Sequence, residues 1–459
     1  MQKLYLKLLN SSYFSKKKYA EANQGFVLPM IIALGLIMTV VGLTIVARSS
    51  DNKATAVSKK QSAQSLAVAE TGVTELMQFI NTVRPLADND LSEWSVEYEA
   101  IRATCADSFT NSTAQNYADA STWITTNNGK DRFRVLDYDY TADDPTNINS
   151  PGVGVLTIEG EANFNQNTST SAVEVNIPVS PRTQGTPGLF VTQANLSNNQ
   201  IDGDLLLYDC DFSGSNIDLS NINGEATANP FAKFPPLPEP PSDSTKVNDL
   251  NNGIGSSLFS GGVSTVTLPR SGDVQADDGV YHYVLGTTGA NSIDLKGGGK
   301  TLIIDPSKKV TFYMEGNVQM KGNAKLIHDC TGVTGCKPTD FQIYGSDGSS
   351  DTYGTGTETT AICLSGGSTV DAFILAPNAN VAVNGGGNNT ASDGTNDESG
   401  EGITGSVWAN SWNDDPNANN CGSNAGKTLV TQNADWNELP IAAPRQIAPA
   451  SNWKRQSAN

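Results

Sequence analysis

The sequence has very little histidine and no run of basic residues long enough to form a basic tail. His282 and His328 are the two histidines among 459 residues, so histidine-based catalysis or metal binding has few side chains to use. The 29 lysines and arginines are outnumbered by 48 aspartates and glutamates, which gives a formal charge of −19. Because phosphate binding needs a basic face, this balance argues against a nucleic-acid partner. The lack of a Cys-x-x-Cys pair excludes zinc-ribbon and thioredoxin-type sites.

Cysteines are few but even in number: Cys105, Cys210, Cys330, Cys336, Cys363 and Cys421. An even count in an exported chain allows disulfide bonds, with several alternative pairings. Cys330 and Cys336 flank a short Thr-Gly-Val-Thr-Gly turn, so they are the pair that we expect first. Six free thiols are the alternative, and the choice depends on the argument for export that follows.

The longest uncharged run lies near the N-terminus. Residues 1–25 are polar and basic, with five lysines against Glu21, and residues 26–47 carry no charge. As a helix this run is roughly 33 Å long, enough to cross the hydrocarbon core of a bilayer. The lysines before it predict a cytoplasmic N-terminus and an extracytoplasmic body. A secretory signal peptide has a shorter apolar core, whereas a plain signal anchor explains the run equally well.

The pattern after Arg48 favours a helix that continues past the membrane. No proline occurs between Arg48 and Pro85, and apolar residues recur at intervals of three and four: Leu66, Ala69, Val73, Leu76, Ile80 and Val83. Such a stripe is typical of a helix that packs on partner helices or on a domain surface. We therefore predict one helix over residues 26–84, ended by Pro85.

The residues around the start of this helix carry a family resemblance. Gly25-Phe26-Val27-Leu28, after a basic leader, resembles the processing site of type IV prepilins. The resemblance implies that a prepilin peptidase cuts between Gly25 and Phe26 and methylates Phe26. The stretch 63–72, Ala-Gln-Ser-Leu-Ala-Val-Ala-Glu-Thr-Gly, resembles PilX-type minor pilins and K-type pseudopilins. Residues 373–383, followed by residues 403–409, resemble the β-rich region that follows PilX-type helices in some bacterial proteins.

This resemblance also implies an assembly helix and its partners. The helix would comprise Leu28, Pro29, Met30 and the apolar stripe. The implied partners are other pilins or pseudopilins, the prepilin peptidase and an inner-membrane assembly platform. Pilins usually carry glutamate at the fifth position after the cut, where this chain has Met30. That glutamate is thought to neutralise the terminal amine of a neighbour, because a buried unpaired charge is costly. The departure implies a minor, priming or tip subunit.

The sequence predicts an α+β chain with a long N-terminal helix, a small α+β domain and a large all-β domain. The predicted segments are a leader (1–25), a transmembrane and amphipathic helix (26–84), a small α+β domain (85–180), strands with a proline-rich linker (181–245) and a β-rich, β-helix-like domain (246–459). Alternating apolar and polar residues predict three antiparallel strands in the small domain. Short apolar segments with Gly and Asn corners favour a right-handed β-helix in the last one, with a flattened sandwich as the alternative.

Several residues raise chemical hypotheses. Asp202 with Asp204, or Asp273, Asp277 and Asp278, are candidate carboxylates of a carbohydrate-active enzyme, although turn and surface carboxylates look the same in a sequence. Oxygen-rich loops at 347–351, 393–401 and 414–415 suggest Ca²⁺, but Asn and Asp also populate turns without an ion. We therefore assign no catalytic residue, no metal and no cofactor beyond a Ca²⁺ candidate. Trp408 and Trp412 either stack on a surface ligand or pack in a core.

Together these features predict a structural subunit and not an enzyme. The leading hypothesis is a minor pilin or pseudopilin that serves assembly, priming or the tip of a type IV pilus or a related secretion or polysaccharide-export machine. The second hypothesis is a membrane-anchored adhesin or polysaccharide-binding protein, and the third a tethered carbohydrate-active enzyme. The expected location is a single-pass membrane protein that reaches the pilus or cell surface after assembly.

Overall fold

The computed structural model describes residues 27–95, 113–126, 129–164, 167–182, 185–196, 199–209, 211–229, 232–255, 258–287, 290–297, 299–346, 361–384, 402–413, 429–432 and 434–456. The chain divides into two compact units, Met1–Gln64 and Ser65–Asn459, and each is described by itself. The leader, Gly25 and Phe26 lie outside the described residues.

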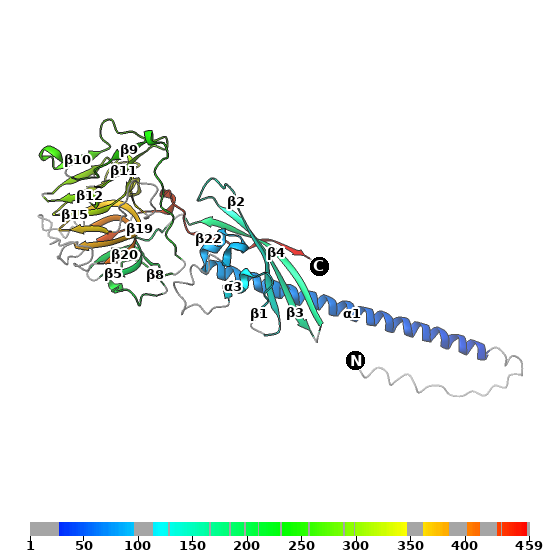
Figure 1. Cartoon of the computed structure of the whole chain (residues 1–459). Helices are drawn as coiled ribbons and strands as arrows, with labels where there is room; N and C mark the ends of the chain where they lie inside the picture. The colour runs from blue at the N-terminus through cyan, green and yellow to red at the C-terminus, as the bar shows by residue number, and fades with distance from the viewer. Residues whose placement is uncertain are drawn as a thin grey trace, which may run out of the picture. The chain divides into compact units, whose positions relative to one another are not determined.

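One long helix, α1 (Val27–Thr82), forms the N-terminal part of the described chain (Figure 1). The predicted long helix is therefore confirmed. The chain leaves the α-helical path just before Pro85, which lies in a short 3-10 helix, η1 (Arg84–Asp88). Proline has no backbone N–H and its ring clashes with the preceding turn, so it cannot continue an α-helix.

An antiparallel sheet is formed by strands that follow this helix in the chain. Its strands are β1 (Ile124–Thr125), β2 (Arg132–Ala142), β3 (Gly152–Phe164), β4 (Asn167–Pro181), β22 (Arg445–Ile447) and β23 (Ser451–Gln456), and a short helix α3 (Thr113–Ala118) precedes them. Both β22 and β23 pair with β4. The prediction that residues up to 459 belong to the large β-rich domain is therefore wrong for this C-terminal segment, which returns to the small sheet.

The apolar stripe of α1 packs on the chain's own antiparallel sheet. Ala69, Val73, Leu76, Ile80 and Val83 are buried with the inward residues of β2, β3 and β4 in one hydrophobic core. Leu66 is partly buried against the same core. Of the two surfaces that the stripe allowed, a partner helix or a domain surface, the structure places it on the domain surface.

Gly160 of β3 allows the helix to lie very close to the sheet. A Cβ atom at this position would overlap the Ser65 carbonyl oxygen and the Ala69 backbone nitrogen, and would lie 3.0 Å from the Ala69 Cα. All three neighbours are backbone atoms of α1, which cannot rotate away as a side chain can. The sheet and helix therefore meet backbone to backbone at this point.

A large parallel sheet holds the other strands. They are β5 (Leu189–Asn195), β6 (Gln200–Asp202), β7 (Leu205–Leu207), β8 (Ala226–Ala228), β9 (Val247–Leu250), β10 (Thr265–Leu268), β11 (Val280–Leu285), β12 (Asn291–Lys296), β13 (Thr301–Ile304), β14 (Lys309–Met314), β15 (Asn317–Lys321), β16 (Lys325–Ile327), β17 (Phe341–Gly345), β18 (Ala361–Ser365), β19 (Thr369–Asn384), β20 (Gly402–Asn413) and β21 (Leu429–Thr431). The predicted mixture of one long helix and a large β-rich region is confirmed.

Strands of this sheet pair with strands three places further along the chain. β10 pairs with β13, β11 with β14 and β12 with β15, always in parallel. The same step then joins β13 to β16, β14 to β17 and β15 to β18. The long strand β19 pairs with all three of β16, β17 and β18. The chain therefore winds in successive coils, and corresponding strands of each coil stack on one another.

Side chains alternate between the interior of the coils and an outer layer. In β14, Val310, Phe312 and Met314 join the central hydrophobic core, while Tyr313 belongs to a second cluster on the other side of the sheet. This alternation follows from the two-residue period of a strand. Both sides of this part of the sheet are thus apolar and buried, as parallel sheets generally require.

The coils are completed by strands from far earlier in the sequence. β5 pairs with β20 and β6 pairs with β21, and β7 and β8 extend the sheet from β5. Within segment 181–245, for which strands and a proline-rich linker are predicted, residues 189–228 contribute strands to the large sheet. Pairing between such distant segments leaves no periodic pattern in the sequence.

The proline-rich stretch connects the two ends of the stack. The chain leaves β8 and next enters β9, which pairs with β11. Eight inter-strand steps separate β8 from β9 by way of β7, β5, β20, β19, β17, β14 and β11, roughly 38 Å at the usual strand spacing. An extended polyproline segment rises about 3.1 Å per residue, so the connection is long enough. Phe234 and Leu237 pack against the outer cluster on the way.

We predict that Gly160→Ala destabilises the helix–sheet unit. The added Cβ overlaps backbone atoms of α1, and overpacking of this kind costs about 1–3 kcal/mol. Urea unfolding of the full chain in detergent, followed by near-ultraviolet circular dichroism, measures the change. Gly214→Ala is the matched control, because its Cβ would meet only the Asp209 carboxylate at an ordinary 3.6 Å. Equal stability of the two variants would contradict the close approach.

Candidate functional site

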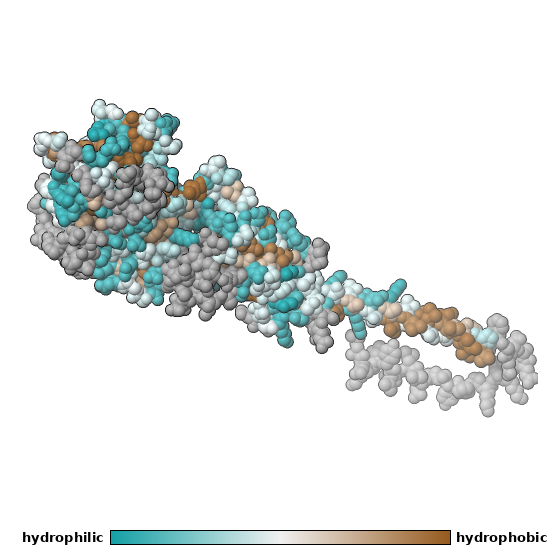
Figure 2. All heavy atoms as spheres, in the orientation of Figure 1, coloured by the Kyte–Doolittle hydropathy of each residue, from teal (hydrophilic) through white to brown (hydrophobic). Residues whose placement is uncertain are grey.

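Residues 28–46 of α1 are apolar or uncharged and exposed on every side. Leu28 is 69% exposed and Met30 is 61% exposed, and large apolar side chains continue to Val46. Figure 2 shows these apolar residues gathered along the N-terminal part of the helix. Thr39 and Thr44 donate their hydroxyls to the carbonyls of Gly35 and Val40, 2.8 and 2.7 Å away. By length and composition, this helix can cross a membrane, where backbone and hydroxyl groups must be satisfied internally.

A lateral cleft lies over the outer side of the parallel sheet. Its volume is about 490 Å³. The floor comes from β11, β14 and β17, which bring His282, Thr311 and Gln342 into the cleft. Two covering segments border it, one through Pro238 to Pro241 and one through Glu438 to Pro440. The cleft therefore lies between these two covering segments, over the outer face of the sheet.

Within the cleft, a buried histidine joins a carboxylate to a tyrosine. His282 lies 3.0 Å from the Asp278 carboxylate through Nε2 and 3.1 Å from the Tyr313 hydroxyl through Nδ1. Burial of Asp278, which raises its pKa, is outweighed by hydrogen bonds from the Val280 N–H and from His282, so the pKa lies below its usual range. Burial also raises the pKa of Tyr313. An ionised carboxylate and a neutral phenol are thus the stable forms at neutral pH.

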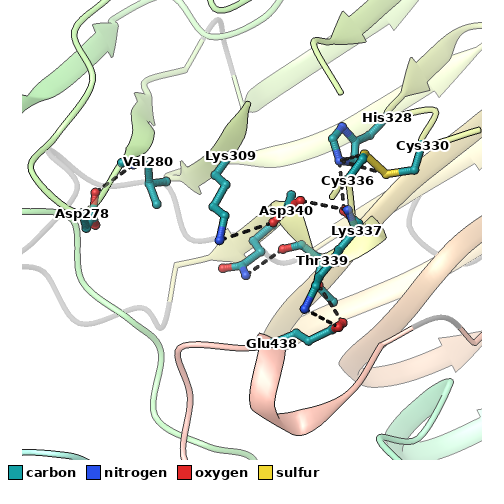
Figure 3. Close-up of polar contacts among 12 residues, drawn as sticks. Asp278, Val280, Lys309, His328, Cys330, Cys336, Lys337, Thr339, Asp340 and Glu438 are labelled. Carbon is teal, nitrogen blue, oxygen red and sulfur yellow. Dashed lines mark hydrogen bonds and ion pairs between the residues drawn. A yellow bond between two sulfur atoms is a disulfide. The ribbon is translucent and has the colours of Figure 1, made fainter. Parts of the chain in front are cut away.

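Ion pairs join residues of another part of the cleft lining, which includes Lys309, Asp340 and Glu438. Lys309 faces the Asp340 carboxylate at 3.6 Å, and Lys337 reaches the Glu438 carboxylate at 2.8 Å (Figure 3). Glu438 also accepts a hydrogen bond of 3.1 Å from the Thr339 hydroxyl. These contacts fasten the C-terminal cover to the turn before β17. The cleft combines charges of both signs with hydroxyl and amide groups, which suits a polar, uncharged ligand such as a sugar.

A histidine, a disulfide and a second hollow lie close to this part of the lining. Cys330 and Cys336 form a disulfide bond, the pairing that the sequence predicts. His328 Nε2 lies 3.7 Å from the Cys330 sulfur and 3.5 Å from the Cys336 sulfur (Figure 3). Cys336 lines a second hollow of about 510 Å³. Cys363 is also disulfide-bonded, whereas Cys105, Cys210 and Cys421 lie outside the described residues.

The predicted carboxylates have structural partners. Asp202 accepts a hydrogen bond from Asn223, and Asp204 accepts one from the Glu225 N–H. Asp273 accepts from the Tyr283 hydroxyl at 2.7 Å and from Arg270, while Asp277 pairs with Lys246. Of the predicted carboxylates, Asp278 alone lines the lateral cleft. The Ca²⁺ candidate loops at 347–351, 393–401 and 414–415 lie outside the described residues.

The two tryptophans, which the sequence leaves as either packing or ligand-stacking residues with packing favoured, are both buried. Trp408 is 0% exposed and Trp412 is 1% exposed. Trp408 lies in the outer cluster, packs edge-on against Phe190 and Phe373, and donates its indole N–H to the Pro187 carbonyl. Trp412 points into the central core. The packing alternative is the correct one for both residues.

Sequence reasoning assigned no role to His282, Tyr313, Gln342 or Glu438. The register places His282 opposite Thr311, and Thr311 opposite Gln342, so the cleft floor is one column of outward residues on successive coils. The neighbouring column holds Tyr313 and Tyr344. In each of β11, β14 and β17, a polar residue is followed two positions later by an apolar or aromatic one. This repeat is visible in the sequence once the register is known.

Comparison with known proteins adds little to these observations. Residues 244–418 match the model of a family described as a domain of unknown function (DUF7305). No curated protein matches the chain. Among solved structures, the competence-associated pilin ComZ from Thermus thermophilus aligns over 86% of this chain and 97% of its own, at 11% identity and a TM-score of 0.25.

We predict that Asp273→Asn destabilises the chain at neutral pH by about 1–3 kcal/mol, because buried Tyr283 loses a charged acceptor. Burial raises the pKa of Asp273, but the hydrogen bonds from Arg270 and Tyr283 outweigh it and leave the pKa below its usual range. The stabilisation is therefore present above the unfolded pKa of about 4 and is lost as pH falls through the folded pKa.

Chemical unfolding between pH 7 and pH 3 tests this prediction. The difference between the natural chain and Asp273→Asn should stay constant down to about pH 5 and then shrink. Asp277→Asn is the matched control, because the Asp277 side chain is 84% exposed and its pair with Lys246 contributes little. A difference that grows on acidification would contradict the assigned role.

Proposed function

We propose that this chain is a membrane-anchored, pilin-like structural subunit of the minor pilin or pseudopilin class. The observation that carries the proposal is the two-part helix α1. Residues 28–46 are apolar or uncharged and exposed all round, and one face of residues 65–82 is buried on an antiparallel sheet. A helix built in this way needs a bilayer before assembly and the helices of other subunits afterwards.

Assembly contacts belong to the first half of the helix. The stripe from Ala69 to Val83 is already buried in the chain's own core. Other pilins would therefore contact residues 28–46. The resemblance around Gly25 supports processing by a prepilin peptidase, with the N-terminus in the cytoplasm and the body outside. Met30 in place of the usual glutamate supports a priming or tip position. Assembly on this basis requires no catalytic residue.

The outer part of the subunit is then a β-helix-like body. The parallel pairing of strands three places apart supports the β-helix that the sequence favoured over a flattened sandwich. Coils that stack on one another present long lateral faces with fixed side-chain columns. Such a face suits the exposed end of a surface fibre, because it offers a rigid platform.

Mass spectrometry of the mature N-terminus tests the proposal. We expect a peptide that begins with N-methylated Phe26, present in cells with prepilin peptidase and missing in cells without it. Gly25→Val should leave the leader attached, because the resemblance requires a small residue at the cut. Gly35→Val is the matched control, since no atom lies within 4 Å of a Cβ there. A chain that keeps Met1 in every strain would refute the pilin class.

The lateral cleft favours a second candidate function, binding of a surface polysaccharide. The cleft is preformed, lies on the rigid sheet and carries hydrogen-bonding groups from three strands. The adhesin reading thus moves from the buried tryptophans to this site. The two functions are compatible, because the helix would place the cleft on a fibre.

Attachment assays separate this second function from assembly. We expect Lys309→Ala, which removes a 62% exposed side chain from the cleft wall, to reduce attachment to polysaccharide-coated surfaces about tenfold or more, equivalent to about 1.4 kcal/mol. Assembly of pili should be unchanged. Lys296→Ala on β12 is the matched control, since Lys296 is a similarly exposed lysine, 47%, away from the cleft. Equal attachment by both variants would exclude the cleft.

A further inference from the structure

The group formed by His328, Cys330 and Cys336 has the geometry of a metal site. One ligand atom of each residue lies within 4.8 Å of the other two. In a tetrahedral zinc site, Zn–S bonds of about 2.3 Å and Zn–N bonds of about 2.05 Å separate a histidine nitrogen from a thiolate sulfur by about 3.5 Å. The observed separations between His328 Nε2 and the two sulfurs are 3.7 and 3.5 Å. The imidazole is therefore already placed for coordination.

The disulfide is what prevents coordination in this form of the chain. Two sulfurs bonded to each other are not thiolates, and the thiolate is the metal ligand. Thiolates bound to one zinc ion lie about 3.8 Å apart. The two Cα atoms are 5.3 Å apart on a short turn, so side-chain rotation and a small movement of the turn are enough to separate the sulfurs.

The surroundings of His328 favour a cation and allow access to the site. The Asp371 carboxylate accepts a hydrogen bond of 3.2 Å from the His328 backbone N–H, and Asp329 is the next residue along the chain. His328 itself is 3% exposed, which gives the ligand a fixed position. Both cysteines are partly exposed, and Cys336 lines the hollow of about 510 Å³. A reductant and a metal ion can therefore reach the sulfurs from solvent.

We propose that Zn²⁺ and the Cys330–Cys336 disulfide are alternative occupants of one site, with zinc bound when the cysteines are reduced. His328 Nε2 and the two thiolates supply three ligands, and a solvent oxygen completes the tetrahedron. Coordination replaces the hydrogen bond between Nε2 and the Lys337 carbonyl, now 3.1 Å long. Neither state requires the other cysteines of the chain.

Reduction of the disulfide with zinc binding, and oxidation with zinc release, interconvert the two states. A trialkylphosphine reduces the disulfide by two electrons and becomes the phosphine oxide, taking its oxygen from water, while both sulfurs receive a proton. Zinc binding then releases these two protons. In the reverse direction, a protein disulfide accepts two electrons from the two thiolates and two protons from solvent and becomes a dithiol, the Cys330–Cys336 bond forms, and Zn²⁺ leaves. If the body lies outside the cytoplasm as proposed above, the disulfide is the expected form there, and zinc binds only where a reductant opens it.

Metal titration of the full chain in detergent micelles tests the proposal. The oxidised chain and the phosphine-reduced chain are titrated with Co²⁺ and with Zn²⁺ against a chromophoric chelator. We expect the reduced chain to show the visible bands of tetrahedral thiolate-bound cobalt, and the oxidised chain to show none at this site. His328→Gln should weaken zinc binding at least about tenfold. Near-ultraviolet circular dichroism reports whether each sample is folded.

Two cysteine variants separate this site from the other thiols. The double variant Cys330→Ser, Cys336→Ser should lose one bound zinc relative to the reduced natural chain. Cys363→Ser is the matched control and should keep it, because Cys363 lies outside the group. Equal uptake by the natural chain and the double variant would overturn the proposal, as would unchanged affinity in His328→Gln. These readouts do not involve pilus assembly, so they stand or fall separately from the proposed function.

Discussion

The need to bury both sides of a parallel sheet governs the rest of the β-rich region. The inner side fills the coils, but the outer side carries Phe190, Tyr344, Phe373 and Trp408, which are also buried. Two covers meet this need. Phe234 and Leu237 belong to the proline-rich connection, and Trp436, Leu439 and Ile441 belong to the C-terminal segment. The covers explain why the chain takes such a long path from β8 to β9. They also explain the cleft, which lies where the outward column becomes polar at His282, Thr311 and Gln342.

The same C-terminal cover connects the large sheet to the small one. Asn149, in the loop between β2 and β3, accepts a hydrogen bond from the Ala443 N–H and donates one to the Ile441 carbonyl. Arg445 then pairs with Asp88 at 2.9 Å and donates to the Ser150 carbonyl. Because Asp88 ends the 3-10 helix after α1, one short stretch of chain touches the outer sheet face, the β2–β3 loop and the helix end. A single segment thus has three structural tasks.

Local patterns predicted the parts of the structure that depend on local interactions. The helix to Thr82 follows from an apolar run, a stripe at helical spacing and Pro85, and the Cys330–Cys336 bond follows from a six-residue separation. The coils were harder to read because their lengths differ: β11, β14 and β17 begin at residues 280, 309 and 341, so no fixed repeat exists. The cleft could not be predicted, since its columns depend on register. For the same reason Trp408, an outward residue, looked available to a ligand although a cover lies over it.

Pairing between β5 and β20 is the feature furthest from any local signal, and it has a clear physical cause. A stack of parallel coils ends in a strand with unpaired N–H and C=O groups, and such an edge invites association with other chains. The match to a domain of unknown function ends at residue 418, just after β20 (Gly402–Asn413). Taken alone, that stretch would expose the edge of β20 that β5 now occupies from Leu189 to Asn195. Strands β5 to β8 therefore cover this edge of β20, and they precede the coils in the chain. Because the proline-rich connection leads the chain to the far end of the stack, the following coils run back toward β5 and β6. The last strands, β20 and β21, then pair with β5 and β6.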